Sequence, residues 1–163
     1  LEVAENSVHY KTMEFEGVCE RSLPAKFIYV DNFMRKPFEC LKNNEILVIA
    51  ADGGEGSRRI PVPFLRRTAM ISAGPVLLAH KTGAALLPIF TVRQRDDRQT
   101  LLIEEPVELE STGQKDTDAI NNMRKLTRLA ERYIERHPCH YLGYLWLIRT
   151  RLDKDSVPFF AGA

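Results

Sequence analysis

A charged, glycine-rich loop contains the residues whose types and spacing are best suited to chemistry. Its candidate substrate-binding residues are Asp52, Gly53, Gly54, Arg58 and Arg59. Backbone N–H groups in a glycine-rich turn can surround an anion, and an arginine guanidinium can bind a phosphate or carboxylate through two hydrogen bonds. Asp52 would orient one of the arginines or a substrate hydroxyl. From residue types alone, an exposed turn with solvated charges remains the alternative.

The loop does not match the common nucleotide-binding motifs. Residues 54–59 read GEGSRR, which lacks the third glycine of G-x-G-x-x-G and the G-K-[ST] of a phosphate-binding loop. Prolines also follow the loop, where those motifs require a helix. The sequence therefore disfavours a nucleotide site, although a small phosphate-ligand enzyme of another family remains an alternative.

Histidines supply the other chemical candidates. His9 and Glu14 form an H-x-x-x-x-E pattern, in which the carboxylate could orient the histidine as a general base; two surface residues are the alternative interpretation. His137 and His140 flank Cys139 in a metal-like arrangement. We expect no metal there, because no second ligand cluster occurs at zinc spacing.

Composition narrows the class of protein. The chain has 163 residues, 44% of them apolar and 28% charged, which fits one globular domain with a substantial core. A net charge of +1 gives no global attraction to nucleic acid or to an anionic membrane. The basic residues lack the aromatic interleaving of a nucleic-acid platform, so we expect no nucleic-acid partner. Three cysteines at wide spacing favour reduced, buried thiols in a cytosolic-type compartment.

The first half of the chain is predicted to alternate between strands and helices. We expect strands at 26–30 and 45–51, with a helix at 33–42 between them. The strand at 45–51 is apolar on both faces, as a buried parallel strand is. The loop 52–60 would then lie at its carboxyl end, where ligands of open α/β sheets usually bind. Residues 60–65 contain two prolines and are expected to form an edge or extended segment.

The second half supplies the remaining elements. We expect helices at 74–82 and 117–136, strands at 84–92 and 100–104, and a last strand or docked segment at 141–148. Gly83 and Pro138 are predicted to end the two helices, and the strand at 100–104 is predicted to return as a hairpin. The fold class is therefore α/β, with a mixed, mostly parallel central sheet flanked by helices.

Three segments stand in an informative order: LKNNEILVIAADGGEG, IPVPFLRRTAMISAGPVLLAHKTGAALLPIF and AERYIERHPCHYLGYL. Over residues 26–146 they resemble the lysophospholipid acyltransferase superfamily, with the late acyltransferases of lipid A synthesis as the nearest branch. That branch has a strand ending in aspartate, a glycine-containing loop, a V-P-F-(F/L)-G segment and a final E-x-x-I-x-x-x-P. The last appears here as Glu131, Ile134 and Pro138, whereas Leu65-Arg66 replaces the usual Phe-Gly.

The resemblance implies a single acyltransferase-like domain over residues 1–163. Its activity would be the transfer of an acyl chain from acyl carrier protein or acyl coenzyme A to a hydroxyl of a lysophospholipid or glycolipid. It implies no metal and no organic cofactor. It also implies peripheral contact with the inner, cytoplasmic face of a membrane, with the glycine loop and nearby arginines holding a phosphate-bearing substrate. A non-catalytic remnant that binds lipid or acyl carrier protein is the alternative.

The resemblance also implies a catalytic pair in an H-x-x-x-x-[DE] motif. His9 and Glu14 match this motif by letters, but too few positions separate Glu14 from Asp52 for the intervening elements of the family. We expect that the chain is the C-terminal part of the domain and that the pair lies before Leu1. If the pair is instead His9 and Glu14, the chain carries its own base.

Overall fold

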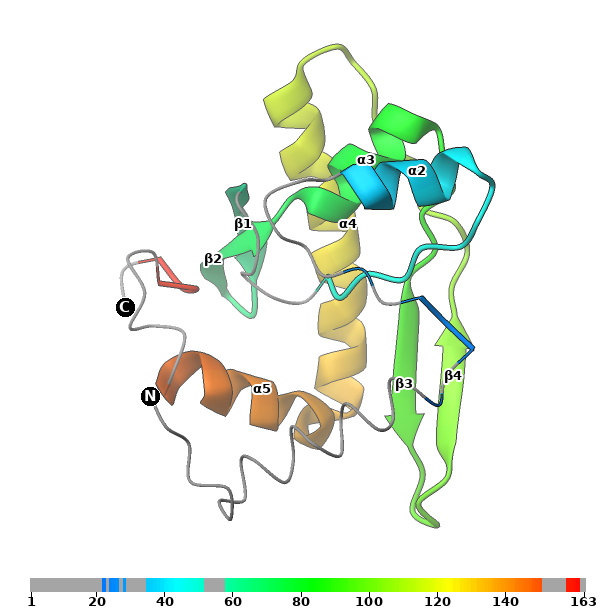
Figure 1. Cartoon of the computed structure of the whole chain (residues 1–163). Coiled ribbons are helices and arrows are strands. Elements are labelled where there is room, and N and C mark those ends of the chain that lie inside the picture. The colour runs from blue at the N-terminus through cyan, green and yellow to red at the C-terminus, as the bar shows by residue number, and fades with distance from the viewer. Residues whose placement is uncertain are drawn as a thin grey trace, which may run out of the picture.

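The computed structural model describes residues 22, 24–26, 28, 35–51, 58–150 and 158–161, with the side chains of 146–150 excepted. In chain order the described elements are α2 (Arg35–Lys42), β1 (Arg59–Phe64), β2 (Arg67–Ser72), α3 (Gly74–Thr82), β3 (Ile89–Arg93), β4 (Gln99–Ile103), α4 (Lys115–Arg136) and α5 (Pro138–Thr150). The long helix α4 runs between the two hairpins, β1–β2 and β3–β4 (Figure 1). Among these helices, none has both the length and the apolar character needed to cross a bilayer.

The β1–β2 hairpin presents one apolar face to α4. Ile60, Val62 and Phe64 are buried at alternate positions of β1, as expected of a strand with one covered face. Pro61 and Pro63 occupy the exposed positions between them. Among the described strands only β2 pairs with β1, and an edge strand of this kind tolerates the prolines. The predicted edge segment is therefore confirmed, whereas its partner strand β2 was not predicted.

The core lies where the hairpin, α4 and the start of α5 meet. Phe64 makes edge-on ring contacts with Tyr141 of α5 and with Phe159, at centroid distances of 5.9 and 6.4 Å. Met123 contributes a completely buried side chain from α4. The buried cluster consists of Ile60, Val62, Phe64, Ala69, Ile71, Ala73, Val76, Ala119, Met123, Tyr141 and Phe159.

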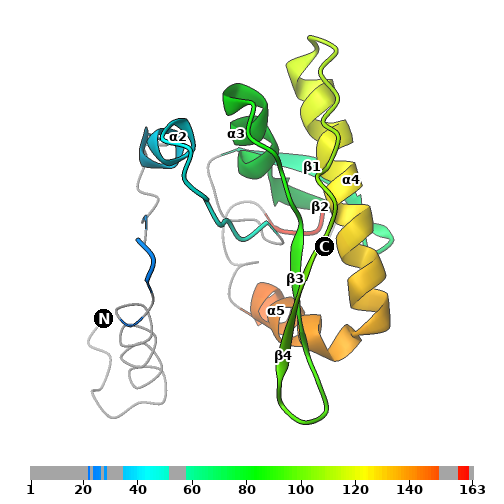
Figure 2. The ribbon, with the colours of Figure 1, turned by 90° about the vertical axis from the view of Figure 1, so that its right-hand side faces the viewer.

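The second hairpin is attached to α4 by an aromatic contact. Phe90 of β3 stacks on Tyr133 with ring centroids 3.9 Å apart. The Tyr133 hydroxyl donates a hydrogen bond to Glu104, and this bond raises the pKa of Tyr133 above its ordinary value. As Figure 2 shows, β3 and β4 continue as a long ribbon alongside α4. The predicted hairpin is confirmed, with antiparallel pairing from Ile89–Ile103 to Arg93–Gln99.

The predicted helices agree well with the structure. Helix α3 has the predicted bounds, and Gly83 follows it in the left-handed conformation with φ 70°, as predicted for a C-terminal glycine. Helix α4 begins at Lys115 rather than 117 and ends at Arg136. Helix α2 covers 35–42 of the predicted 33–42, and Pro37 lies in its first turn, where a missing N–H is tolerated.

The predicted buried strand at 45–51 is wrong. These residues form no strand, and Ile46 and Val48 are 92% and 80% exposed. Apolar character made the segment look like an interior strand, but a strand is stable only when a neighbour pairs with its backbone groups. In the described part of the chain, both strand pairs close through short local turns, and neither pairs with 45–51.

Three other strand predictions need correction. Residues 26 and 28 are not in a strand, and the rest of the 26–30 prediction lies outside the described residues. The strand predicted at 84–92 begins only at Ile89. The segment 141–148 belongs to helix α5, and Pro138 begins that helix rather than only ending α4. A short apolar run does not distinguish strand from helix by periodicity, which explains this error.

The predicted sheet is also only partly observed. The described residues form a mixed α/β arrangement with helices beside β strands, as expected. However, both described sheets are two-stranded and antiparallel, so a mostly parallel central sheet is not seen among these residues.

Candidate functional site

The structure describes part of the glycine-rich loop's surroundings. Asp52, Gly53 and Gly54 lie outside the described residues, as do His9 and Glu14. Arg58 and Arg59 are described, and they lead directly from the loop into β1. The geometry of the candidate site therefore rests on these two arginines and on the groups that hold them.

Arg58 contacts residues at the starts of two helices. Its carbonyl oxygen accepts a hydrogen bond from the Ala73 N–H at 3.0 Å, next to the start of α3. Its guanidinium forms an ion pair with Asp116, in the first turn of α4. A carboxylate is favourable at this end of a helix, because the unpaired N–H groups there carry partial positive charge. The downstream end of the loop is therefore anchored between the starts of α3 and α4.

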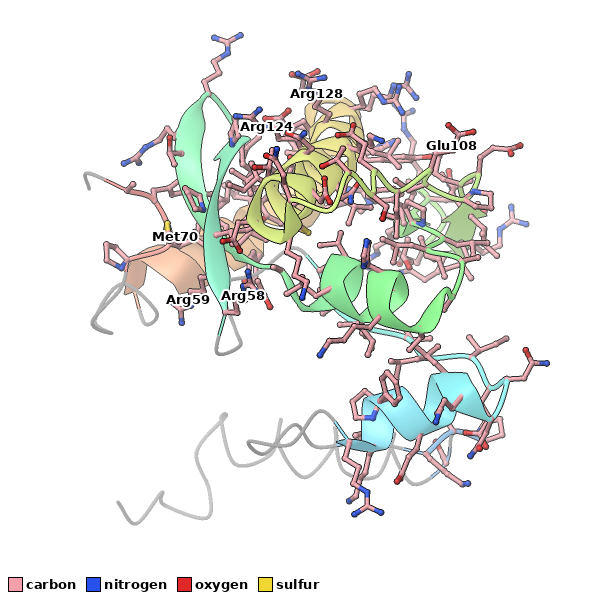
Figure 3. All side chains as sticks on the ribbon, turned by 90° about the horizontal axis from the view of Figure 1, so that it is seen from above. Arg58, Arg59, Met70, Glu108, Arg124 and Arg128 are labelled. Carbon is pink, nitrogen blue, oxygen red and sulfur yellow. The ribbon has the colours of Figure 1, made fainter. Side chains whose placement is uncertain are left out.

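The Arg58–Asp116 pair is open to solvent and exchangeable. The two side chains are 49% and 85% exposed, and exposed pairs contribute only about 0–1 kcal/mol to stability. A guanidinium has five N–H donors, so an incoming phosphate can bind Arg58 beside Asp116 or in its place. Figure 3 shows Arg58 and the half-buried Arg59 together at one end of the hairpin. Two adjacent cations thus stand directly after the glycine-rich loop.

Sequence reasoning missed Asp116. Fifty-eight positions separate it from Arg58, and nothing in either local sequence indicates that they meet. The only available signal was the acidic first turn of α4, which is also typical of any helix start.

Glu131 is a second residue whose role the sequence did not predict. Its Oε1 atom accepts a hydrogen bond from the Leu65 N–H at 2.6 Å, which joins α4 to the turn of the β1–β2 hairpin. Leu65 and Arg66 both have positive φ values, 50° and 62°. The family motif E-x-x-I-x-x-x-P was a signal for Glu131, although it did not say what the carboxylate contacts.

The described histidines do not form a catalytic pair with a carboxylate. His80 Nε2 lies 2.9 Å from the Ser111 hydroxyl oxygen. His140 Nε2 accepts a hydrogen bond from the Arg93 N–H at 2.9 Å, and its ring packs against that of His137. In 35–51, 58–145 and the shorter described pieces, no group of three metal-ligating side chains occurs.

The cysteines differ from the prediction of buried thiols. Cys40 is half-buried, Cys139 is exposed, and both are free thiols. Cys19 lies outside the described residues. Cys139 lies in the first turn of α5.

A comparison of the chain with protein families agrees with the resemblance that its sequence motifs indicated. The family of bacterial lipid A biosynthesis acyltransferases has a model that matches residues 21–152. This match includes the glycine-rich loop, both hairpins and helices α2 to α5. No relative was found among curated proteins. Because the match covers well over half of the 163 residues, the chain belongs to the bacterial lipid A biosynthesis acyltransferase family.

Proposed function

We propose that this chain transfers a fatty acyl group from an acyl thioester to a hydroxyl of a lysophospholipid or glycolipid. The observation that carries the proposal is the family match over residues 21–152, which contains the Asp-Gly loop and the arginines after it. The donor is acyl carrier protein or acyl coenzyme A. The proposed acceptor carries a phosphate, because glycines and arginines at this spacing suit the binding of an anion.

The proposed reaction requires neither a metal nor an organic cofactor. A base removes the acceptor's hydroxyl proton while the oxygen attacks the thioester carbonyl carbon. The tetrahedral intermediate collapses, the C–S bond breaks, and the leaving thiolate takes up a proton. The products are an ester and a free thiol. A thiolate leaves more readily than an alkoxide, so the step needs positioning, proton transfer and stabilisation of the oxyanion.

In this proposal the loop and its arginines position the acceptor. Arg58 and Arg59 bind the acceptor phosphate, assisted by the backbone of Gly53 and Gly54, and Asp52 orients an arginine or the reacting hydroxyl. The exposure of Arg58 supports this role, since its side chain is 49% exposed and its ion pair with Asp116 is weak enough to be exchanged for a phosphate. His9 and Glu14 remain the candidates for the catalytic pair within the chain.

The proposed place of action is the cytoplasmic face of a membrane, reached by peripheral contact. The acceptor is a lipid, whereas both donor classes are water-soluble. An enzyme that joins the two must therefore work at the boundary between them.

Kinetics with variants of Arg58 test the binding role. Arg58→Ala should raise KM for a phosphate-bearing acceptor about ten- to hundredfold, the usual cost of losing a charged hydrogen bond. Asp116→Ala removes the ion pair but keeps the cation, so its KM should stay near the wild-type value. Arg95→Ala, in the exposed β3–β4 turn, is the charge-matched control. If Asp116→Ala impairs KM as much as Arg58→Ala, Arg58 is structural.

A non-catalytic remnant is the second candidate function. It is favoured by the contacts of the described histidines, which are to a hydroxyl, a backbone N–H and another ring. Such a protein would bind lipid or acyl carrier protein and release no thiol. Substituting His9 or Glu14 by alanine separates the candidates: lost transfer with retained lipid binding supports the enzyme, whereas binding without transfer in the wild type supports the remnant.

A further inference from the structure

The 158–161 segment lies along the outer edge of β2 as a short third strand. The Met70 N–H donates to the Phe159 carbonyl oxygen at 2.6 Å, and the Ala161 N–H donates to the Thr68 carbonyl oxygen at 2.9 Å. These two bonds flank an antiparallel bridge between β2 and the segment. Figure 1 shows the segment, in red, beside β2. Thr68 and Met70 therefore direct their backbone groups away from β1.

The outer edge of β1 is poorly suited to such an addition. Pro61 and Pro63 of β1 lie opposite Met70 and Thr68. Opposite residues of an antiparallel ladder alternate between pairs that exchange two backbone bonds and pairs that exchange none. Because Met70 and Thr68 direct their bonds outward, their proline partners also face outward, where a proline has no N–H to donate. An added strand would therefore find its donors and acceptors at β2 but would find two donors missing at β1.

Aromatic side chains give the β2 edge its selectivity. Phe159 is 3% exposed, and its ring lies edge-on to that of Phe64 with centroids 6.4 Å apart. Phe160 is held differently, because the Arg67 guanidinium lies 4.7 Å from the centroid of its ring, within the range of a cation–π contact. In strand addition, backbone bonds supply affinity and side-chain contacts supply specificity. The edge therefore suits an extended peptide with two consecutive phenylalanines.

The 158–161 segment is attached less firmly to β2 than β1 is. Strands β1 and β2 pair from Arg59–Ser72 to Phe64–Arg67, along the whole of both strands. The segment is held, among the described residues, by one bridge flanked by two backbone bonds. Local opening occurs most readily where the fewest bonds must be broken. The segment can therefore leave the edge while the hairpin stays folded.

We propose that the outer edge of β2 is a peptide-binding site for an extended segment that contains Phe-Phe. The chain's own 158–161 segment fills the site and can be exchanged for the same sequence supplied as a free peptide. Recognition depends on the outward backbone groups of Thr68 and Met70 and on the side chains of Phe64 and Arg67. Peptide binding at this edge is independent of acyl transfer, so it can be tested without turnover.

A labelled peptide of residues 155–163 tests the site by fluorescence anisotropy on the full-length protein. Ala161→Pro removes the segment's bond to Thr68 but still allows an extended chain. This variant should bind the peptide about fivefold or more tightly than the wild type, in which the intact segment competes. Ala161→Gly keeps the N–H and is the matched control, with an affinity within about twofold of the wild type. Equal affinities of Ala161→Pro and the wild type would overturn the proposal.

N-methylated peptides test the geometry of binding. A methyl group on the Ala161 nitrogen removes the donor to Thr68, whereas the Phe160 nitrogen points away from β2 in the alternating pattern. Methylation at Ala161 should weaken binding to the Ala161→Pro variant about tenfold or more, and methylation at Phe160 by less than about threefold. Equal losses from the two methyl groups would show that the peptide does not bind as this strand.

Hydrogen exchange in the wild-type protein gives a test that needs no variant. The Met70 amide is bonded to the segment, whereas the Ile71 amide is directed toward β1. If the segment opens alone, Met70 should exchange about tenfold or more faster than Ile71. Equal protection would mean that the segment and the hairpin open together, and no exchangeable site would exist.

Sedimentation identifies which copy of the chain supplies the segment. If the segment fills the site of its own chain, excess peptide should leave the sedimentation of the wild-type protein unchanged apart from the bound peptide. A dimer that excess peptide dissociates would mean that a second copy supplies the segment, contrary to the proposal.

Discussion

Strain at the Leu65-Arg66 turn is a residue-scale feature of this chain. Both residues have left-handed φ values of 50° and 62°, a conformation that side chains with a Cβ atom disfavour. The Leu65 N–H is bound by the Glu131 carboxylate, which helps to keep the turn in place. The resemblance had placed glycine at the Arg66 position, and the structure gives the physical reason for that preference.

Arg66→Gly should therefore stabilise the protein. Relief of left-handed strain is worth about 1–2 kcal/mol, and the extra backbone freedom of glycine costs about 0.5–1 kcal/mol. We expect a net rise of about 0.5–1 kcal/mol in the free energy of unfolding, measured by urea denaturation. Arg67→Gly, one residue later in β2, should destabilise, since it also loses the contact of its guanidinium with the Phe160 ring. A fall in stability for Arg66→Gly would refute the strain argument.

Glu110 gives a residue-scale prediction about pH. Hydrogen bonds from the Asn121 side chain and from Lys125 lower the pKa of the Glu110 carboxyl below its ordinary value. The unfolded chain therefore takes up this proton first as pH falls, and the stabilisation present at neutral pH is lost as pH falls through the folded-state pKa. Glu110→Gln should lower stability at pH 7 and flatten its decline from pH 5 to pH 3. Glu105→Gln, at an exposed site, should leave that decline unchanged.

At the scale of elements, local signals explain what the sequence could predict. The bounds of α3 and most of α4 follow from apolar periodicity and end signals, and the β3–β4 hairpin needs only a short turn. The segment 45–51 shows what local sequence signals do not predict. Its apolar residues fit a strand, but pairing depends on distant partners that local sequence does not specify. The Arg58–Asp116 contact was unpredictable for the same reason.

Two glycines provide an element-scale test with opposite signs. Gly83 ends α3 at φ 70°, and Gly143 lies within α5; an added Cβ meets nothing within 4 Å at either position. Gly83→Ala should cost about 1 kcal/mol because alanine is strained in the left-handed region. Gly143→Ala should stabilise by about 0.5–1 kcal/mol, since alanine favours a helix. Thermal melts monitored by circular dichroism measure both, and shifts of the same sign would contradict the assigned conformations.

At the scale of the whole molecule, a segment near the end of the sequence completes the β1–β2 core. The Met70 N–H donates to the Phe159 carbonyl oxygen at 2.6 Å, and the Ala161 N–H donates to the Thr68 carbonyl oxygen at 2.9 Å. The Phe159 ring is buried against Phe64. Phe159 and Phe160 are apolar in the sequence, but local sequence does not show that this segment extends the hairpin.

Phe159→Ala should reveal how much this segment contributes. Removing a buried phenylalanine ring costs about 3–5 kcal/mol, so the variant should unfold at markedly lower denaturant concentration than the wild type. Phe160→Ala, at the half-buried neighbour, should cost less. Equal losses of stability in the two variants would contradict the structure, in which the Phe159 side chain is more deeply buried than that of Phe160.

The most direct test of the account is an acyl-transfer assay on the purified full-length protein. Acyl carrier protein and acyl coenzyme A thioesters are offered with either a lysophospholipid or a lipid A precursor, and acylated lipid and released thiol are measured together. We predict equal, time-dependent appearance of both products with at least one acceptor, and a raised acceptor KM for Arg58→Ala. No acylated lipid with either acceptor class and either donor would contradict the claim that this chain is an acyltransferase.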